Sequence, residues 1–209
     1  MITIHDFIEQ RIAEGMDPHS AELINEVFTK FPNVDTGTWY RRRNKALLAL
    51  LGKQRFARVF EVAGGSGLFA SMFMKEHPET KLYVHSDFSR VACELARERL
   101  KPYPVTAEMV LDMRGDIDPV QWGRYNLIVS TALEHLPAGV DLSILSRVKK
   151  GRHVLLSLAT FAGATHPNPY PTREYIEERF SPLIDINTLQ SFCPVWLLHG
   201  VKRSLSQWN

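Results

Sequence analysis

The chain has 209 residues, of which 44% are hydrophobic and 23% are charged, the balance of one globular domain with a substantial core. Its 25 basic and 23 acidic residues leave a net charge of +2, too small for the surface of a dedicated nucleic-acid binder. Cys93 and Cys193 lie far apart and fit neither a disulfide framework nor a zinc motif. No apolar run is long enough to cross a bilayer, and the start lacks the features of a signal peptide, so we expect a cytoplasmic protein without a membrane partner.

Residues 1–52 are expected to form a helical extension. Asp17-Pro18 is a helix-start signal, and apolar side chains recur at helical spacing from Leu23 to Phe31. After a turn-like stretch, Thr38 can cap a second helix, which Gly52 ends. The apolar faces of these helices must pack on the rest of the chain, so the extension is predicted to cap the following domain.

From residue 53 onward, short apolar runs alternate with helix-like segments, the pattern of a parallel sheet covered on both faces. The predicted strands are Arg58–Ala63, Lys81–Ser86, Val105–Leu111, Tyr125–Thr131 and His153–Thr160, followed by two extended runs over 183–192 and 195–204. The predicted helices are Leu68–His77, Arg90–Leu100, Asp116–Trp122 and Val140–Val148, with a short one capped at Thr172. Only two residues separate the last two strands, which must therefore be antiparallel neighbours. We expect an α/β fold, a doubly wound, mostly parallel seven-stranded sheet over residues 53–209.

A glycine-rich turn follows the first predicted strand. The strand contains the acid Glu61 and runs into Gly64-Gly65-Ser66-Gly67 before a helix, an arrangement that offers backbone N–H groups to a ligand. Asp87 ends the second strand 20 residues after Gly67, where a carboxylate can accept hydrogen bonds from both hydroxyls of a ribose. This pair implies a cofactor that contains a nucleoside.

Two cofactors fit this pattern. The spacing Gly65-x-Gly67-x-x-Ala70 also satisfies the dinucleotide motif, so a nicotinamide cofactor is one alternative. Three features favour S-adenosylmethionine instead: the acid Glu61 inside the first strand, the helical extension before the motif, and the closing antiparallel strand pair.

Four elements, in this order and spacing, resemble the class I S-adenosylmethionine-dependent methyltransferases that act on small molecules. They are Glu61–Gly67, Asp87-Phe88-Ser89, Leu111-Asp112-Met113, and Trp122–Ser130 with its continuation Leu133-Glu134-His135-Leu136-Pro137. Ala63 replaces the first glycine of the family's loop, and an alanine fits there if its φ is negative. The resemblance covers the chain from about residue 55 and implies a Rossmann-like methyltransferase fold with S-adenosylmethionine as the cofactor.

The resemblance also implies roles for individual residues. The loop contributes Glu61, Ala63, Gly64, Gly65 and Gly67, of which Gly65 and Gly67 lie nearest the methionine part of the cofactor. Asp87 is expected on the ribose, Phe88 beside the adenine, Asp112 on the adenine amine, the Met113 backbone N–H on the ring, and Ser130 at the end of the fourth strand. Of Arg41, Arg42 and Arg43, only one or two can face inward; Arg43 is assigned to the cofactor carboxylate, with a solvated helix face as the alternative.

Methyl transfer from a sulfonium requires a general base only where the acceptor is protonated. His135, just past the fourth strand, is the best-placed base, and an ordinary loop histidine is the alternative interpretation. His166 and Tyr170, in the proline-rich loop after the fifth strand, are further candidates for the acceptor pocket, with an ordinary surface loop as the favoured interpretation of each. No metal is expected, because no group of acids and histidines has ligand spacing.

The segment Asn168-Pro169-Tyr170-Pro171 resembles the N-P-P-Y box of nucleic-acid amine methyltransferases. It follows the fifth strand rather than the fourth, and its second proline is replaced by tyrosine, so we expect no nucleic-acid partner. The function we expect is methyl transfer from S-adenosylmethionine to an oxygen or nitrogen of a small molecule. The alternatives are an NAD(P)-dependent oxidoreductase and a non-catalytic, cofactor-binding partner subunit, and the sequence does not indicate an oligomeric state.

Overall fold

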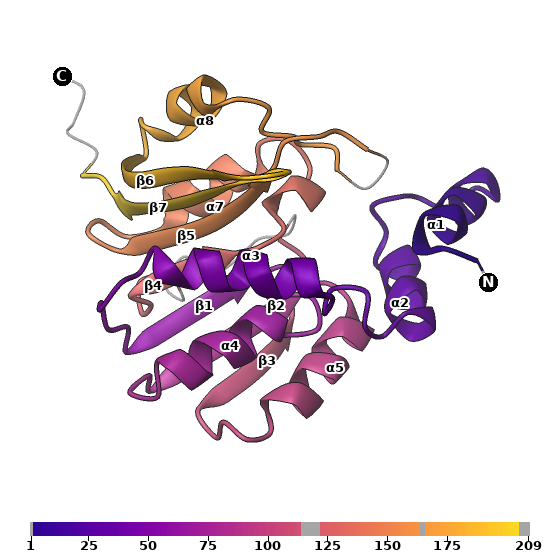
Figure 1. Cartoon of the computed structure of the whole chain (residues 1–209), viewed down its shortest axis with the longest axis horizontal. Helices are drawn as coiled ribbons and strands as arrows, with labels where there is room; N and C mark the ends of the chain where they lie inside the picture. Colours follow the sequence, from indigo (N-terminus) through magenta and orange to yellow (C-terminus); the bar gives the residue numbers. More distant parts are fainter. Residues whose placement is uncertain (1, 114–121, 164–165, 205–209) are drawn as a thin grey trace.

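The computed structural model describes residues 2–113, 122–163 and 166–204, which contain a seven-stranded sheet with the order β3-β2-β1-β4-β5-β7-β6 (Figure 1). The strands are β1 (Arg58–Val62), β2 (Leu82–Asp87), β3 (Thr106–Val110), β4 (Leu127–Ser130), β5 (His153–Ala159), β6 (Ile184–Phe192) and β7 (Val195–Lys202). The first five strands pair in parallel, whereas β7 is antiparallel to both of its neighbours, β5 and β6. The predicted α/β fold is confirmed, including the antiparallel pairing of the last two strands.

Helices cover both faces of the sheet because successive strand residues point to opposite sides. Val59, Leu127 and Leu155 belong to one buried apolar cluster, with side chains of α3 (Thr38–Ala49), α4 (Leu68–Glu76) and α5 (Arg90–Leu100). The neighbouring residues Phe60 and Ile128 belong to the opposite cluster, with α7 (Val140–Arg147) and α8 (Arg173–Phe180). Of the described helices, none combines the length and apolar character that a membrane span requires.

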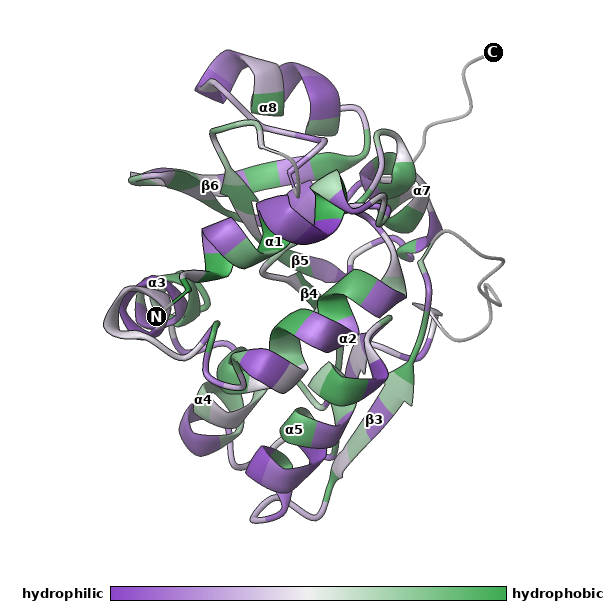
Figure 2. Ribbon diagram, turned by 90° about the vertical axis from the view of Figure 1, so that its right-hand side faces the viewer, coloured by the Kyte–Doolittle hydropathy of each residue, from purple (hydrophilic) through white to green (hydrophobic). Residues whose placement is uncertain are grey.

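The N-terminal helices α1 (Ile4–Ala13) and α2 (Ala21–Lys30) form a hairpin that lies off the carboxyl ends of the parallel strands (Figures 1 and 2). The hairpin has its own small core around Phe7 and Leu23, and the Arg11 guanidinium pairs with Glu26 at 2.7 Å. The extension predicted over residues 1–52 therefore has two parts. The α1–α2 hairpin stands at the strand ends, whereas α3 packs on the face of the sheet.

Helix boundaries differ from the predicted ones at the N-terminus. The helix α2 begins at Ala21 rather than at Asp17-Pro18, because the Ser20 hydroxyl accepts the backbone N–H of Leu23 at 3.1 Å and caps the helix there. Thr38 is the first residue of α3 rather than its cap, and α3 ends at Ala49, before Gly52. Residues 116–121 of the helix predicted over Asp116–Trp122 lie outside the described residues.

Candidate functional site

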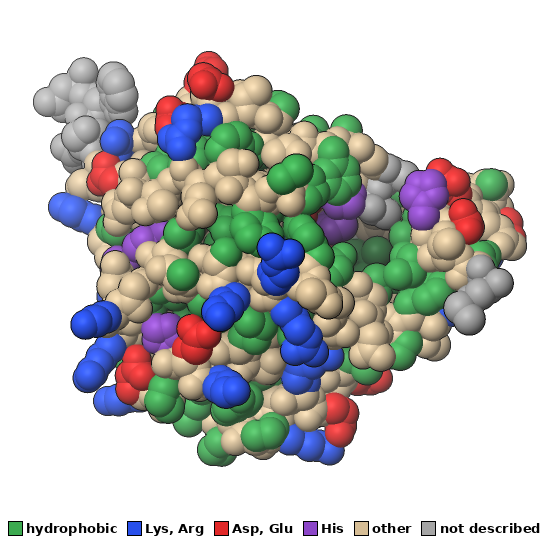
Figure 3. Space-filling model, viewed as in Figure 1, with side chains coloured by type: hydrophobic (Ala, Val, Ile, Leu, Met, Phe, Trp, Pro, Cys, Tyr) green, Lys and Arg blue, Asp and Glu red, His purple; other side chains and the backbone are tan. Residues whose placement is uncertain are grey.

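A cavity of about 610 Å³ lies between the α1–α2 hairpin and the carboxyl ends of β1, β2 and β4. Figure 3 shows a hollow between the N-terminal hairpin and the rest of the molecule, with hydrophobic side chains around it and histidines at its edges. Its polar lining includes Asp35, Arg43, Asp87, Glu134, His135 and His166. Its apolar lining includes Ile4, Ile8, Ile24, Val27, Phe28, Trp39, Phe88 and Phe161. An apolar cavity with a few convergent polar groups at the strand ends is the usual form of a ligand site in such folds.

The glycine-rich loop forms one wall of the cavity through Ala63, Gly64 and Gly65. The condition for an unstrained alanine at position 63, a negative φ, is not met: the φ of Ala63 is +52°, in the left-handed region where an alanine side chain is strained. Gly65 and Gly67 also have positive φ, of +57° and +76°. Between β1 and α4, three residues of the loop therefore have a left-handed backbone conformation. Two of them are glycines, and the third is Ala63.

Two of the glycines are required by close packing. A Cβ at Gly64 would lie 2.6 Å from the ring of His85 and 2.7 Å from the carboxyl carbon of Glu61, and a Cβ at Gly67 would lie 2.9 Å from that of Ala96 on α5. Gly67 was predicted to contact the cofactor, but it does not line the cavity. It packs against Ala96 of α5 instead.

Asp87 ends β2 beside the loop, where sequence analysis placed it. Its carboxylate accepts the backbone N–H groups of Gly65 and Ser89, both at 2.9 Å, and its side chain lines the cavity. Burial raises the pKa of the Asp87 carboxyl to about 6. The next residue, Phe88, also lines the cavity.

Glu61 lies fully buried beneath the loop and does not line the cavity. Burial raises the pKa of its carboxyl to about 8, so the group is mostly protonated at neutral pH. The same burial lowers the pKa of the neighbouring His85 to about 4, so this imidazole is neutral. The loop thus rests on two uncharged but titratable side chains.

Asp35, in the connection between α2 and α3, is a site residue that sequence analysis missed. Its carboxylate accepts the Ser66 backbone N–H at 2.7 Å and the Ser66 hydroxyl at 2.5 Å, directly over the glycine loop. Arg99 of α5 donates to the Ser66 carbonyl from the other side. The only signal in the sequence was the turn-like stretch that contains Asp35, and this gave no indication of its partner.

Arg43 faces inward, whereas Arg41 and Arg42 are exposed. The Arg43 guanidinium donates to the Asn44 side chain at 2.9 Å and to the Thr131 carbonyl at 3.1 Å, and it lines the cavity. It also lies 5.3 Å from the centres of the rings of Trp39 and Tyr40, a cation–π distance. Burial lowers the pKa of this guanidinium, which nevertheless stays charged at neutral pH.

Besides Glu61 and Gly67, three predicted cofactor contacts lie outside the cavity wall. Asp112 is exposed after β3, Met113 is buried in the core, and Ser130 is buried at the end of β4, where its hydroxyl accepts the Ala132 N–H at 3.4 Å. The cavity wall at β4 is formed instead by Thr131 and Ala132.

His135 and His166 meet at the cavity wall. His135 ends the 3₁₀ turn Leu133–His135 after β4, and its ring centre lies 4.4 Å from that of His166, in the loop after β5. Glu134, which belongs to the motif Leu133-Glu134-His135-Leu136-Pro137 but had no predicted role, lines the cavity beside them. Burial lowers the pKa of His166 to about 4, an effect that the neighbouring His135 reinforces.

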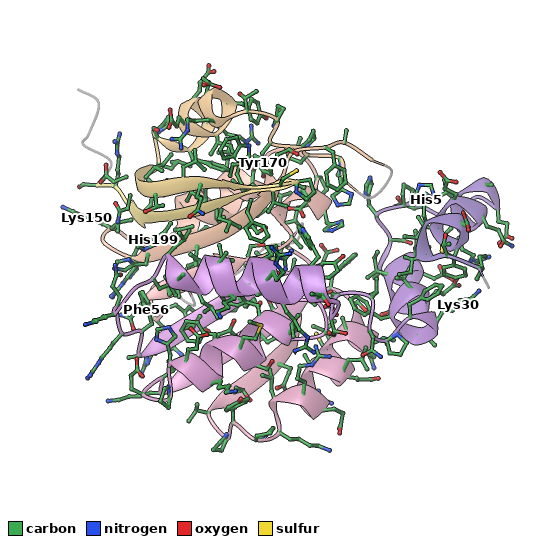
Figure 4. The ribbon with its side chains drawn as sticks, viewed as in Figure 1. His5, Lys30, Phe56, Lys150, Tyr170 and His199 are labelled. Atoms are coloured by element: carbon green, nitrogen blue, oxygen red, sulfur yellow. The ribbon has the colours of Figure 1, made fainter. Side chains whose placement is uncertain are left out.

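Tyr170 does not belong to the cavity, contrary to the suggestion that it lines an acceptor pocket. Figure 4 shows it among the upper strands and α8, apart from His5 and Lys30 on the N-terminal hairpin. Its side chain is fully buried, and its hydroxyl donates to Asp141 at 2.9 Å while accepting from Asn168 at 3.0 Å. The residue is part of the core under α8, because the proline-rich loop folds inward at this point.

Part of the chain is similar in sequence to fungal polyketide synthases. It is 30% identical over 118 residues to the non-reducing polyketide synthase ausA of Emericella nidulans, and 27% identical over 126 residues to the non-reducing polyketide synthase trt4 of Aspergillus terreus. The matches cover 54% and 57% of this chain but only 5% of each synthase. No protein-family model matches the chain.

Solved structures of methyltransferases share the fold. The N-methyltransferase NodS of Bradyrhizobium japonicum, in complex with S-adenosylhomocysteine, has a TM-score of 0.65 and 17% identity, over 82% of this chain and 91% of that one. The CurJ carbon methyltransferase has a TM-score of 0.65 and 15% identity, over 90% of this chain and 59% of that one. Magnesium protoporphyrin IX methyltransferase of Synechocystis, with bound S-adenosylmethionine, has a TM-score of 0.62 and 17% identity, over 83% of this chain and 84% of that one. The chain therefore has the fold of the class I S-adenosylmethionine-dependent methyltransferases.

Proposed function

We propose that the protein transfers a methyl group from S-adenosylmethionine to an oxygen or nitrogen of a small, largely apolar molecule. The observation that carries this proposal is the cavity at the strand ends, whose wall includes Gly65, Asp87, Arg43 and His135. Each of these residues was assigned to cofactor or chemistry from the sequence alone. The S-adenosyl ligands bound by two methyltransferases of the same fold support the choice of cofactor.

The cofactor would extend along the loop from Asp87 to Arg43. Asp87 would bind the ribose hydroxyls, Phe88 would pack on the adenine, and Gly65 would approach the methionine part, whose carboxylate would pair with Arg43. Asp112 and Met113 do not line the cavity. Their contacts with the adenine therefore stay a prediction from the sequence. The sulfonium of S-adenosylmethionine is already activated by its positive charge, so the protein's main contribution is to align the donor with the acceptor.

His135 would take the proton from a hydroxyl or ammonium acceptor. It is exposed, lines the same cavity as Asp87 and Arg43, and lies at the strand end where the methyl group is expected. A general base of this kind typically contributes about 10²- to 10⁴-fold to the rate. The apolar part of the wall would exclude water and favour an acceptor with aromatic or aliphatic bulk.

Carbon is a second candidate for the accepting atom. The sequence match to two polyketide synthases and the shared fold of a carbon methyltransferase both favour it. The carbon between two carbonyl groups loses its proton to a base much as a phenol does, so His135 would have the same role.

The test is a comparison of cofactors followed by an assay of transfer. In calorimetry and thermal-shift measurements, S-adenosylhomocysteine should bind and stabilise the protein, whereas NADH and NADPH should not. With labelled S-adenosylmethionine, a phenol, an amine and a β-dicarbonyl compound should be compared as acceptors. His135→Gln should lower kcat about 100-fold or more without weakening S-adenosylhomocysteine binding, whereas His19→Gln, in the same cavity wall, should leave kcat within a few-fold. Stabilisation by NADPH instead would overturn the proposal.

A further inference from the structure

Three potential metal ligands lie together on the wall of the cavity. They are Glu134 and His135, in the 3₁₀ turn after β4, and His166, in the loop after β5. One ligand atom from each lies within 4.8 Å of the other two. They meet because β4 and β5 are adjacent parallel strands, whose carboxyl ends share one edge, and because the backbone bridge between Gly163 and His166 turns the second loop back.

The carboxylate of this cluster is buried and incompletely paired. Glu134 is 4% exposed, and its Oε2 has no hydrogen-bond partner among the described residues, although the side chain borders the cavity. A buried carboxylate oxygen without a partner is costly unless something else supplies a positive charge or a donor. The site is therefore built in a way that favours a cation.

The two imidazoles are suited to ligation. The side chains of His135 and His166 each carry a ring nitrogen that can ligate a metal ion when the imidazole is neutral. The tilted rings of His135 and His166, 4.4 Å apart at their centres, place the second imidazole beside the first.

We propose that Glu134, His135 and His166 bind one divalent cation of the manganese-to-zinc series. Two imidazoles and one carboxylate suit these metals better than magnesium or calcium, which prefer oxygen ligands. With metal–ligand distances of about 2.1 Å, ligands on one tetrahedral ion lie about 3.4 Å apart. The observed spread of up to 4.8 Å thus requires the side chains to close by up to about 1.4 Å, which side-chain rotations can supply.

Binding of the cation can be tested separately from the proposed function, whereas the part of the cation in the reaction rests on that function. Three protein ligands leave at least one coordination position open to the cavity, as in catalytic metal sites. In the proposed methyl transfer, an acceptor hydroxyl or enol bound to the cation would lose its proton to solvent more easily. Its oxygen would then form the bond to the methyl carbon as the carbon–sulfur bond breaks, releasing S-adenosylhomocysteine. The cation would replace His135 as the group that activates the acceptor.

The test measures metal binding on the full chain without a histidine tag, after treatment with a chelator. Titration with Zn²⁺ in a calorimeter should give one site per chain, and Co²⁺ should give the visible absorption of a low-coordinate nitrogen-and-oxygen site. Glu134→Gln and His166→Ala should each weaken Zn²⁺ binding at least tenfold. His19→Ala removes another histidine of the same cavity wall and should bind Zn²⁺ as the parent does. Circular dichroism and S-adenosylhomocysteine affinity report whether each variant is folded.

Each result has a separate meaning for the two proposals. Undiminished Zn²⁺ binding by the double variant His135→Ala/His166→Ala, or no binding by the parent, overturns the metal site. If the parent binds S-adenosylhomocysteine but not Zn²⁺, only the metal site fails. If it binds Zn²⁺ through these residues but not S-adenosylhomocysteine, the metal site is supported and the proposed methyltransferase function fails.

Discussion

The Asp87 side chain both stabilises the glycine-rich loop and borders the cavity in which a ligand would bind. Its carboxylate accepts the N–H groups of Gly65 and Ser89, which fixes the loop against the end of β2, yet it still borders the cavity. Burial outweighs these two hydrogen bonds and raises the pKa of the carboxyl to about 6. A group with this pKa changes its charge just below neutral pH.

Affinity for S-adenosylhomocysteine should therefore depend on pH through Asp87. The ionised carboxylate is the better acceptor for two ribose hydroxyls, so affinity should fall about tenfold between pH 7.5 and pH 5 as the carboxyl is protonated. Asp87→Asn should bind about 10- to 100-fold more weakly at pH 7.5 and lose this pH dependence. Asp185→Asn, on an exposed side chain of β6, is the control and should keep it. Calorimetry at several pH values makes the comparison, and an unchanged pH profile in Asp87→Asn would assign the titration to another group.

Residue patterns in the sequence predicted the parts of the site that follow from strand ends. Asp87 and His135 were found because parallel strands bring their carboxyl ends to one edge, whereas Arg43 was chosen from three adjacent arginines by the resemblance to methyltransferases. Asp35 and His166 join the site through loops that fold back from the α2–α3 connection and from β5. No periodicity connects such loops to their partners, so the contact of Asp35 with Ser66 and the Glu134–His135–His166 cluster were not predictable.

At the scale of elements, the strands of the sheet were predicted to within a residue or two. Buried parallel strands read as short apolar runs, and the two-residue connection Cys193-Pro194 allowed only an antiparallel pairing of β6 with β7. The N-terminal helices were less predictable. Helix α2 begins at a cap on Ser20, and α1 precedes it as a separate helix, because local hydrogen bonds rather than apolar spacing set these ends.

The contact between α4 and α5 depends on the missing side chain of Gly67. Gly67→Ala combines a left-handed φ of +76° with a Cβ 2.9 Å from Ala96, so it should lower the free energy of unfolding by about 2 to 4 kcal/mol. Gly139→Ala has a similar φ of +89° but open space around the new Cβ, so it should cost about 1 to 2 kcal/mol. Urea unfolding of both variants measures the difference. Equal losses would show that packing against α5 does not require a glycine at position 67.

At the scale of the whole molecule, the cavity exists because the α1–α2 hairpin stands over the strand ends. Helix α2 is held to the start of α5 by Asn25, whose side-chain oxygen accepts the Ser89 hydroxyl at 2.8 Å and the Val91 N–H at 3.3 Å. Asp35 holds the following connection to the glycine loop. The cavity lies between the hairpin and the sheet, so opening it there would break these polar contacts.

Binding of S-adenosylhomocysteine should therefore slow hydrogen exchange in the hairpin as well as in the loop. At a ligand concentration 100-fold above Kd, segments whose opening releases the ligand should exchange up to about 100-fold more slowly. We expect this in α2, in residues 63–67 and in the first turn of α3, because each of these segments contributes residues to the cavity wall. The β6–β7 hairpin, which touches the cavity only at its turn through Pro194 and Val195, is the internal control. Asn25→Ala should speed exchange in α2 of the free protein, since it removes both contacts to the start of α5. Protection confined to residues 63–67, with α2 unaffected by ligand, would mean that the cofactor binds without the hairpin closing over it.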